Sequence, residues 1–313
     1  MRLKPFPPDA QADDLGAATR TISRRSFVRK ALAAAAAMVA GAVSAEPAGK
    51  LRLGFMVWRI GDILDFDRQV EWVANAGFES ISFHASAGAP GKWRGVEPAK
   101  ADAKERRRIR RLLAPFRDCE IHAPFEAVVG PETPEATLKK LENVLTFAGD
   151  VGAAVVTVHV EPPGSGASDA AWQTALDRLD TAAAKAGVRV GLEFYTGFEW
   201  LRQPRRKRIG ATLDVGHMYL HDGAGYRPYG SVGRLARFLG DALFHLHVHD
   251  YDGKADHIEI GTGRVDFDEV LAVLAAMKYR GALCLELNPE RCSPEGIRRS
   301  AAFLRQRAVA MQG

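Results

Sequence analysis

The stretch FHLHVHDYD, Phe244 to Asp252, places three of the nine histidines of the chain at alternate positions. Alternation with period two predicts a β-strand with His245, His247 and His249 on one face. A strand rises about 3.3 Å per residue, so the first and last of these histidines are expected roughly 13 Å apart. They cannot all bind one ion. We expect three layers along one strand, with His245 deep and hydrogen-bonded and His249 near a substrate or a second metal.

Seven further β-rich runs alternate with amphipathic helical patterns along the chain. The helical patterns cover residues 65–78, 133–153 and 266–281, and most end in glycine before the next strand, as a helix C-cap does. Eight strands with helical crossovers predict an α/β protein, a single-domain (β/α)8 TIM barrel. A doubly wound open sheet is the rival, but no glycine-rich nucleotide turn follows the first strand. The expected strands are residues 51–58, 79–85, 119–125, 154–162, 188–195, 209–217, 243–250 and 282–288.

The N-terminal segment has the features of an export signal. SRRSFVRK, Ser23 to Lys30, is a twin-arginine motif, and a short apolar run ending in small residues follows it. The apolar run is too short to span a bilayer. An ordinary first helix with a basic start is the alternative. We expect residues 1–45 to be a twin-arginine signal peptide recognised by the twin-arginine export machinery, and residues 46–313 to be a periplasmic barrel domain.

Charge and cysteine usage narrow the function classes. The whole chain has a formal charge of +5, but residues 1–45 carry seven of its 43 Lys and Arg and three of its 38 Asp and Glu. The remainder has a net charge of +1, so we expect no nucleic-acid partner. The basic runs at 104–111 and 204–208 are interpreted as a solvated helix face and a loop. The cysteines, Cys119, Cys284 and Cys292, lack metal-site spacing, and their odd number leaves at least one thiol free.

Histidines and carboxylates gather where the expected strands end. In a (β/α)8 barrel these positions form the C-terminal rim, which carries the active site. Glu193, Asp214 and Glu286 each close a hydrophobic strand, where an unpaired carboxylate costs on the order of several kcal/mol. A divalent cation such as Mn, Co, Zn, Fe or Mg removes that cost. The histidines, none of them expected in a helix, are His84, His122, His159, His217, His221, His245, His247, His249 and His257.

Five short motifs carry a family resemblance. They are GLEF (191–194), LDVGH (213–217), HVHD (247–250), HIEIGTGRVDF (257–267) and LELN (285–288). With these motifs in this order, the chain resembles the xylose-isomerase-like superfamily of TIM barrels. This superfamily includes the sugar phosphate isomerase and epimerase family and is related to the apurinic-site endonucleases. The resemblance covers essentially all of the chain after the signal.

The resemblance implies a ligand set and a reaction. Glu193, Asp214, His247 and Glu286 correspond to the metal ligands, and His217 to a substrate contact or a ligand of a second ion. The two glutamates would lie on opposite faces of a substrate carbon, where one removes a proton next to a carbonyl and the other returns it. We therefore expect a divalent-metal-dependent isomerase or epimerase of a small-molecule sugar or polyol.

Two alternatives remain open. The endonuclease branch adds metal ligands to which His122, His159 and His257 could correspond. Together with His217, they suggest a multinuclear metallohydrolase or lyase acting on a glycoside or phosphoester. That branch has an aspartate where this chain has Ala255, with Asp256 one position later. The other alternative is a non-catalytic sugar-binding barrel.

Aromatic side chains are weaker candidates for substrate contacts. Trp58, Trp93, Phe125 and Tyr219 fall in or near expected rim loops, where packing within the loop explains them equally well. No glycine loop of the phosphate-binding type is present, which favours a free sugar or a glycoside over a sugar phosphate. The oligomeric state is open, with a homo-oligomer as one option.

Overall fold

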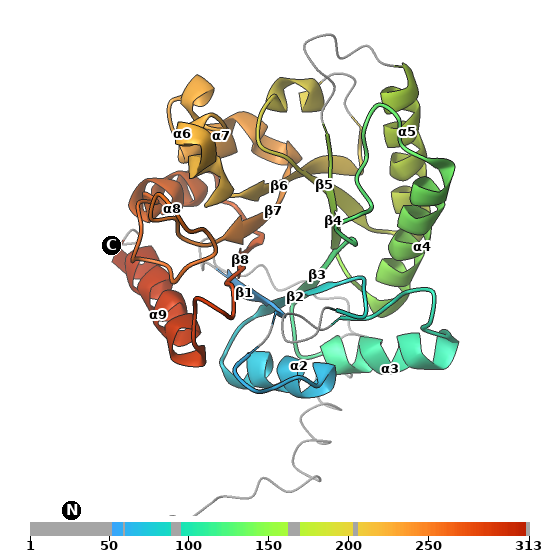
Figure 1. Ribbon diagram of the computed structural model, residues 1–313, viewed down its shortest axis with the longest axis horizontal. Coiled ribbons are helices and arrows are strands. Elements are labelled where there is room, and N and C mark those ends of the chain that lie inside the picture. Colours follow the sequence, from blue (N-terminus) through green and yellow to red (C-terminus); the bar gives the residue numbers. More distant parts are fainter. Residues whose placement is uncertain (1–51, 59, 89–94, 162–169, 203–205, 311–313) are drawn as a thin grey trace, which may run out of the picture. The chain divides into compact units, whose positions relative to one another are not determined.

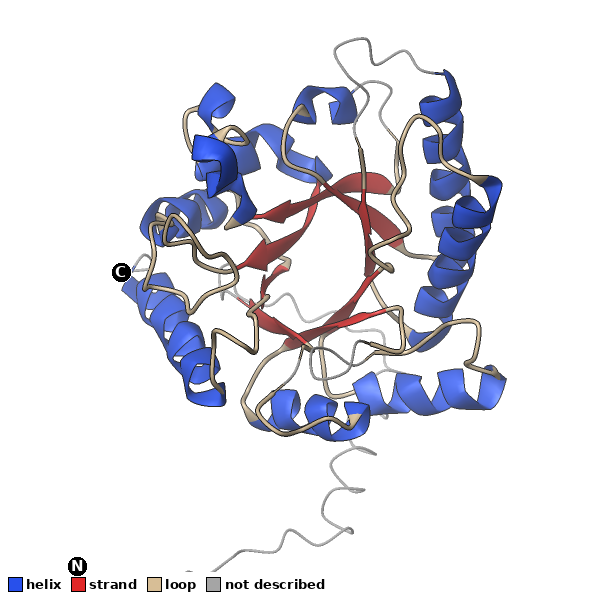
Figure 2. Cartoon of the chain, viewed as in Figure 1, coloured by secondary structure: helices blue, strands red, loops and turns tan. Residues whose placement is uncertain are grey.

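Eight parallel strands form one closed barrel. The computed structural model describes residues 52–58, 60–88, 95–161, 170–202 and 206–310. Figures 1 and 2 show the strands as an inner ring with helices outside it, and each strand pairs with its neighbours in chain order until β8 closes on β1. The predicted single (β/α)8 barrel is confirmed. The strands are β1 (Arg52–Met56), β2 (Ser80–His84), β3 (Asp118–His122), β4 (Val155–His159), β5 (Arg189–Glu193), β6 (Ile209–Asp214), β7 (Leu243–Val248) and β8 (Ala282–Leu285).

Helices follow the strands and cover the outside of the barrel. Side-chain caps start several of them: Asp65, Asp102 and Ser231 each accept a backbone N–H of the first turn. Gly152 ends α4 with a φ of 84°, the left-handed conformation predicted for a glycine C-cap. The helices are α2 (Phe66–Asn75), α3 (Ala103–Leu113), α4 (Glu135–Val151), α5 (Ala170–Ala186), α6 (Leu220–Gly223), α7 (Val232–Leu239), α8 (Phe267–Ala276) and α9 (Pro294–Ala310).

The barrel interior is polar where many TIM barrels are filled by branched apolar side chains. Thr157 and Thr212 share a hydrogen bond of 2.8 Å across the interior. The Cys284 thiol donates to the Ser82 hydroxyl at 3.0 Å. The apolar core lies instead between the strands and the surrounding helices, where Phe55 and Phe83 are fully buried. This arrangement leaves the barrel axis free for chemically active groups.

Strand register brings predicted site residues side by side. His84 is paired with His122, His159 with Glu193, and Asp214 with His247. Because neighbouring strands lie about 4.8 Å apart, the strand pairing alone brings the two residues of each pair close together.

Several smaller expectations can be compared with the structure. The basic run 104–111 lies in α3, where Arg106 pairs with Asp150 at 2.7 Å, and all three cysteines are free and buried. The expectation that no histidine lies in a helix is wrong, since His217 begins a short 3-10 helix (His217–Tyr219) and His221 lies in α6. The signal peptide at 1–45 and Trp93 fall outside the described residues. Among the helices that are described, none has the length and apolar character needed to cross a bilayer.

Candidate active site

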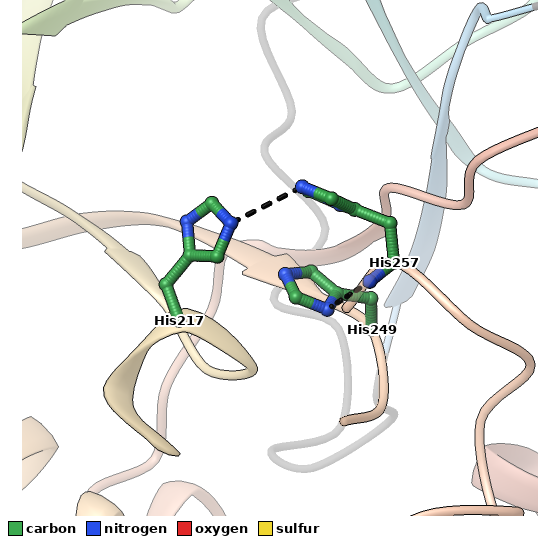
Figure 3. A group of neighbouring side chains, drawn as sticks. All are labelled: His217, His249 and His257. Atoms are coloured by element: carbon green, nitrogen blue, oxygen red, sulfur yellow. Dashed lines mark hydrogen bonds between the residues drawn. The ribbon is translucent and has the colours of Figure 1, made fainter. Parts of the chain in front are cut away.

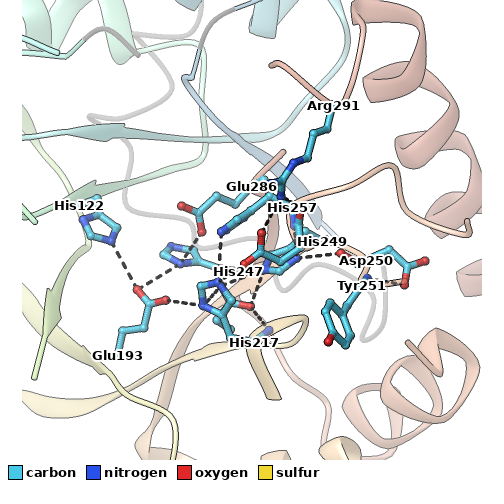
Figure 4. Close-up of polar contacts among 12 residues, drawn as sticks. His122, Glu193, His217, His247, His249, Asp250, Tyr251, His257, Glu286 and Arg291 are labelled. Atoms are coloured by element: carbon cyan, nitrogen blue, oxygen red, sulfur yellow. Dashed lines mark hydrogen bonds and ion pairs between the residues drawn. The ribbon is translucent and has the colours of Figure 1, made fainter. Parts of the chain in front are cut away.

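Four side chains meet inside the C-terminal rim, and Figure 4 labels three of them, Glu193, His247 and Glu286. They are the residues predicted as metal ligands: Glu193 ends β5, Asp214 ends β6, His247 lies in β7 and Glu286 follows β8. His247 Nδ1 lies 3.1 Å from Glu286 Oε2 and 3.6 Å from Glu193 Oε2. Donor atoms of Glu193, Asp214 and His247 all lie within 4.8 Å of one another. At most 4% of any of the four residues is exposed.

The carboxylates are kept ionised by surrounding imidazoles. Burial by itself raises the pKa of Glu193, but the four histidines that surround its carboxylate outweigh burial and hold that pKa well below its usual range. Burial acts against the charge of Glu286 too, yet the charge of His247 lowers the pKa of this carboxyl. Both carboxylates are therefore available to bind a cation or accept a proton at neutral pH.

His122 and His159 flank Glu193 on one side. The Nε2 atoms of both rings lie 3.4 Å from Glu193 Oε2. His122 Nδ1 is 2.7 Å from the carbonyl oxygen of Ala123. Because a carbonyl only accepts, Nδ1 carries the proton and donates it, and Nε2 is left to face Glu193. This is the orientation that a metal-ligating histidine takes when its other nitrogen is held by the backbone.

A second histidine group, shown in Figure 3, consists of His217, His249 and His257. His217 Nδ1 is 3.0 Å from Asp214 Oδ2, and His217 Nε2 is 3.1 Å from His257 Nε2. His257 Nδ1 donates to the carbonyl oxygen of Glu286 at 3.0 Å, so its Nε2 also faces inward. Burial by itself lowers the pKa of His217, but the negative charge of Asp214 outweighs burial and raises this pKa to about 12. His217, His249 and His257 together have donor atoms close enough for an ion.

Both ring nitrogens of His249 have hydrogen-bond partners. The backbone N–H of His257 donates to His249 Nδ1 at 2.9 Å. His249 Nδ1 also lies 3.1 Å from the carbonyl oxygen of Asp250, and its Nε2 lies 2.9 Å from Asp214 Oδ1. His249 thus contacts a predicted metal ligand, and its donor atoms lie within 4.8 Å of those of His217 and His257.

The site contains one buried residue that the sequence analysis missed, Glu120, and one that it placed at the rim without a role, His84. Glu120 lies two positions before His122 in β3, faces the barrel interior and is 1% exposed. His84 ends β2, and its ring centroid is 5.0 Å from that of His122. The signal for Glu120 was present in the sequence, because its alternation with His122 matches the alternation of His245 with His247.

The expected aromatic contacts separate into site and loop residues. The Phe125 ring lies over three histidines, with centroids 4.9 Å from His84, 5.1 Å from His122 and 5.4 Å from His159. Trp58 is buried edge-on against His257. The Tyr219 hydroxyl accepts the backbone N–H of Asp266, a loop contact.

Tyr195, which was not predicted from the sequence, is 46% exposed beside His217, with 5.4 Å between the ring centroids. Together with Phe125 it gives two aromatic rings next to the histidine groups.

The central residues fit a divalent cation. Glu193 Oε2, His217 Nδ1 and His247 Nδ1 are buried and have no hydrogen-bond partner. Buried polar atoms are normally paired, so these converging imidazole and carboxylate atoms are candidates to bind a cation. Imidazole combined with carboxylate suits Mn, Fe, Co or Zn.

Structural comparison finds similar barrels among solved proteins. A xylose isomerase domain protein from Planctomyces limnophilus has a TM-score of 0.65 and 18% identity, with 85% of this chain and 98% of that chain covered. A D-tagatose 3-epimerase-like protein has a TM-score of 0.63 and 20% identity, covering 84% and 98%. The 3-keto-D-glucoside 4-epimerase from E. coli has a TM-score of 0.63 and 16% identity, covering 82% and 100%. At these identities the likeness concerns the fold.

Sequence comparison gives the family. An uncharacterized protein of Methanocaldococcus jannaschii is 28% identical over 193 residues, which span 53% of this chain and 63% of that relative. The profile of the xylose isomerase-like TIM barrel matches residues 70–307, most of the chain, and confirms the resemblance carried by the five motifs. The chain belongs to the xylose isomerase-like TIM barrel family.

Proposed function

We propose that this protein is a divalent-metal-dependent isomerase or epimerase that moves a proton next to the carbonyl of a small sugar or polyol-derived substrate. One observation carries the proposal: the buried carboxylates of Glu193 and Glu286 approach the same nitrogen of His247 from different strands. Solved proteins of similar fold include a 3-keto-D-glucoside 4-epimerase and D-tagatose 3-epimerase-like protein.

Proton transfer next to a carbonyl needs a base and an acid held on either side of one carbon. Glu193 and Glu286 fill these roles, since both are buried beside His247: the ionised carboxylate of one takes the proton, and the other returns a proton that it carries in that step. Glu193, Asp214, His247 and Glu286 would hold the cation, which would supply positive charge next to the reacting carbonyl. The surrounding histidines orient the carboxylates and accept hydrogen bonds from substrate hydroxyls.

The rim offers a place for the sugar ring. Phe125 and Tyr195 are partly exposed beside the two histidine groups. Aromatic faces pack against the apolar C–H surface of a sugar, which leaves its hydroxyls to polar partners. This favours an unphosphorylated sugar or an oxidised glycoside as the substrate.

The decisive experiment combines metal analysis with a screen of ketoses, aldoses and oxidised glycosides in deuterated water. We expect deuterium to enter the substrate at the carbon next to the carbonyl. Glu286→Gln removes a base and a ligand at once and should reduce kcat by at least a hundredfold. Glu290→Gln, a change at an exposed residue of the following loop, is the matched control. Unchanged turnover in Glu286→Gln overturns the assignment.

A multinuclear hydrolase is the second candidate, because two histidine groups flank the central carboxylates. His122 with His159, and His217 with His257, present ring nitrogens around Glu193 and Asp214. In that case His122→Asn and His257→Asn each remove one bound ion and abolish hydrolysis of a glycoside or phosphoester. An isomerase keeps its central ion in both variants.

Export completes the proposal. We propose that residues 1–45 are a twin-arginine signal that delivers the folded barrel to the periplasm. Replacement of Arg24 and Arg25 by lysine should leave the protein in the cytoplasmic fraction. Periplasmic recovery of that variant in the same amount as wild type refutes the signal.

A further inference from the structure

A separate group of ligand-type side chains lies deeper in the barrel. Glu120 comes from β3, and His245 with His247 from β7, so they meet across the barrel interior rather than along one strand. Their donor atoms all lie within 4.8 Å of one another. The three residues are 1%, 4% and 0% exposed. None of the functions considered above uses Glu120 or His245.

The carboxylate of Glu120 is buried without a hydrogen-bond partner on either oxygen. The nearest imidazole nitrogen, His247 Nε2, is 3.9 Å from Glu120 Oε2, which is too long for a hydrogen bond. Burying a carboxylate without a partner costs on the order of several kcal/mol. The spacing leaves room for a positive charge between the two side chains.

The two histidines point to the same occupant. His245 Nε2 and His247 Nε2 are also buried without hydrogen-bond partners. Two imidazoles and one carboxylate form a ligand set that zinc and other borderline divalent cations prefer, with a water in the remaining position.

A cavity of about 500 Å³ connects this group to the N-terminal mouth of the barrel. Glu120 and His245 are among its lining residues, together with the first residues of three strands, Arg52, Asp118 and Arg189. The cavity therefore opens on the face opposite to the histidine rim. It provides the entry path and the water that a metal site requires.

We propose that Glu120, His245 and Nε2 of His247 bind a second divalent cation inside the barrel, reached from the N-terminal mouth. His247 then stands between two ions, with Nδ1 toward the outer site of Glu193 and Glu286 and Nε2 toward the inner site. A neutral imidazole keeps one ring proton, so simultaneous binding of both ions by His247 would require the loss of that proton to water. Occupation of one site changes the affinity of the other, and the coupling is reciprocal.

The test is anomalous diffraction from crystals of the full-length protein stripped with chelator and soaked in Zn²⁺. We expect a zinc peak between Glu120 and His245, on the side of His247 away from Glu286. Glu120→Leu should lose this peak and one equivalent of zinc by mass spectrometry while keeping the outer ion. Asp214→Asn should show the reverse, with the outer peak weakened and the inner one retained.

Two results overturn the inner site: a wild-type map without that peak, or equal zinc content and affinity in wild type and Glu120→Leu. Glu120→Leu removes a buried charge and keeps the volume, so it is expected to fold, and circular dichroism checks this. His245→Asn is the second variant and should also lose the inner peak. An inner ion in a protein inactive on every sugar refutes the proposed reaction and leaves this site intact.

Discussion

At the scale of single residues, Glu193 lies at the centre of the site. Four imidazoles approach it, from His122, His159, His217 and His247. Each comes from a different part of the chain, and each favours the ionised carboxylate. One carboxylate thus links the central ligand group to the histidine groups on both sides.

Gly216 makes room for the ring that orients Asp214. A Cβ at this position would lie 2.2 Å from His249 Cε1, while the backbone conformation itself suits any residue. We expect Gly216→Ala to displace His249 from Asp214 and to cost about 1–3 kcal/mol of unfolding free energy, measured by urea denaturation. Gly130→Ala, where the nearest atom is 3.4 Å away, is the control and should cost less. Equal losses in both variants contradict the steric argument.

His84 gives the metal-free protein a characteristic pH dependence. Burial, assisted by the charge of His122, lowers the pKa of His84 to about 3, whereas in the unfolded chain it is near 6.5. As the pH falls below 6.5 the unfolded chain takes up this proton and the folded protein does not, so stability is lost. The loss reaches about 2 kcal/mol at pH 5.

The measurement for His84 is the unfolding free energy at pH 7 and pH 5, in wild type and in His84→Gln. The variant should lose less stability between the two values. His221→Gln, at an exposed histidine, should behave as wild type. A His84 variant with undiminished pH dependence shows that another group causes the loss.

At the scale of elements, β7 distributes its histidines over three different environments. His245 joins Glu120 in the interior, His247 lies among the carboxylates, and His249, just past the strand end, contacts Asp214 and His257. Three layers along one strand were predicted from the rise per residue alone. The expected hydrogen bond of His245 is not found at Nε2, which is buried without a partner.

The junction of α4 with β4 depends on the left-handed conformation of Gly152. A Cβ there meets nothing closer than 3.8 Å, so strain in the backbone and not steric overlap decides the cost. We expect Gly152→Ala to reduce the unfolding free energy by about 1 kcal/mol, and Gly152→Asn to cost less because asparagine tolerates this conformation. Thermal and urea unfolding of both variants measure this, and the opposite order refutes it.

At the scale of the whole molecule, cation binding should be visible as stability. A cation that binds only the folded barrel adds about 2.7 kcal/mol at a concentration of one hundred times Kd. For a domain of this size that raises Tm by roughly 5–10 °C. We expect this rise with Mn²⁺, Co²⁺ or Zn²⁺ after chelation, and a smaller rise in Asp214→Asn. Asp222→Asn, at an exposed rim residue, is the control. An unchanged Tm with all three cations contradicts a metal site.

The strands were predictable in number and order, but their ends were not. The run 209–217 was expected to be one strand, whereas β6 ends at Asp214 and His217 begins a 3-10 helix. The chain turns there because Asp214 Oδ1 accepts the backbone N–H of His217 at 2.9 Å. A side chain that serves both the site and the turn ends the strand, and hydrophobic periodicity does not record such a bond.

The sequence by itself determined the barrel, because alternation within short strands and glycine-ended helical crossovers leave few other ways to bury the apolar residues. It also determined that strand-end carboxylates and histidines share one rim. Only the tertiary structure decided which ring nitrogens are engaged, as in His249, and that Glu120 lies opposite His245. Those facts depend on distances between strands far apart in the chain, and on backbone partners that no local pattern specifies.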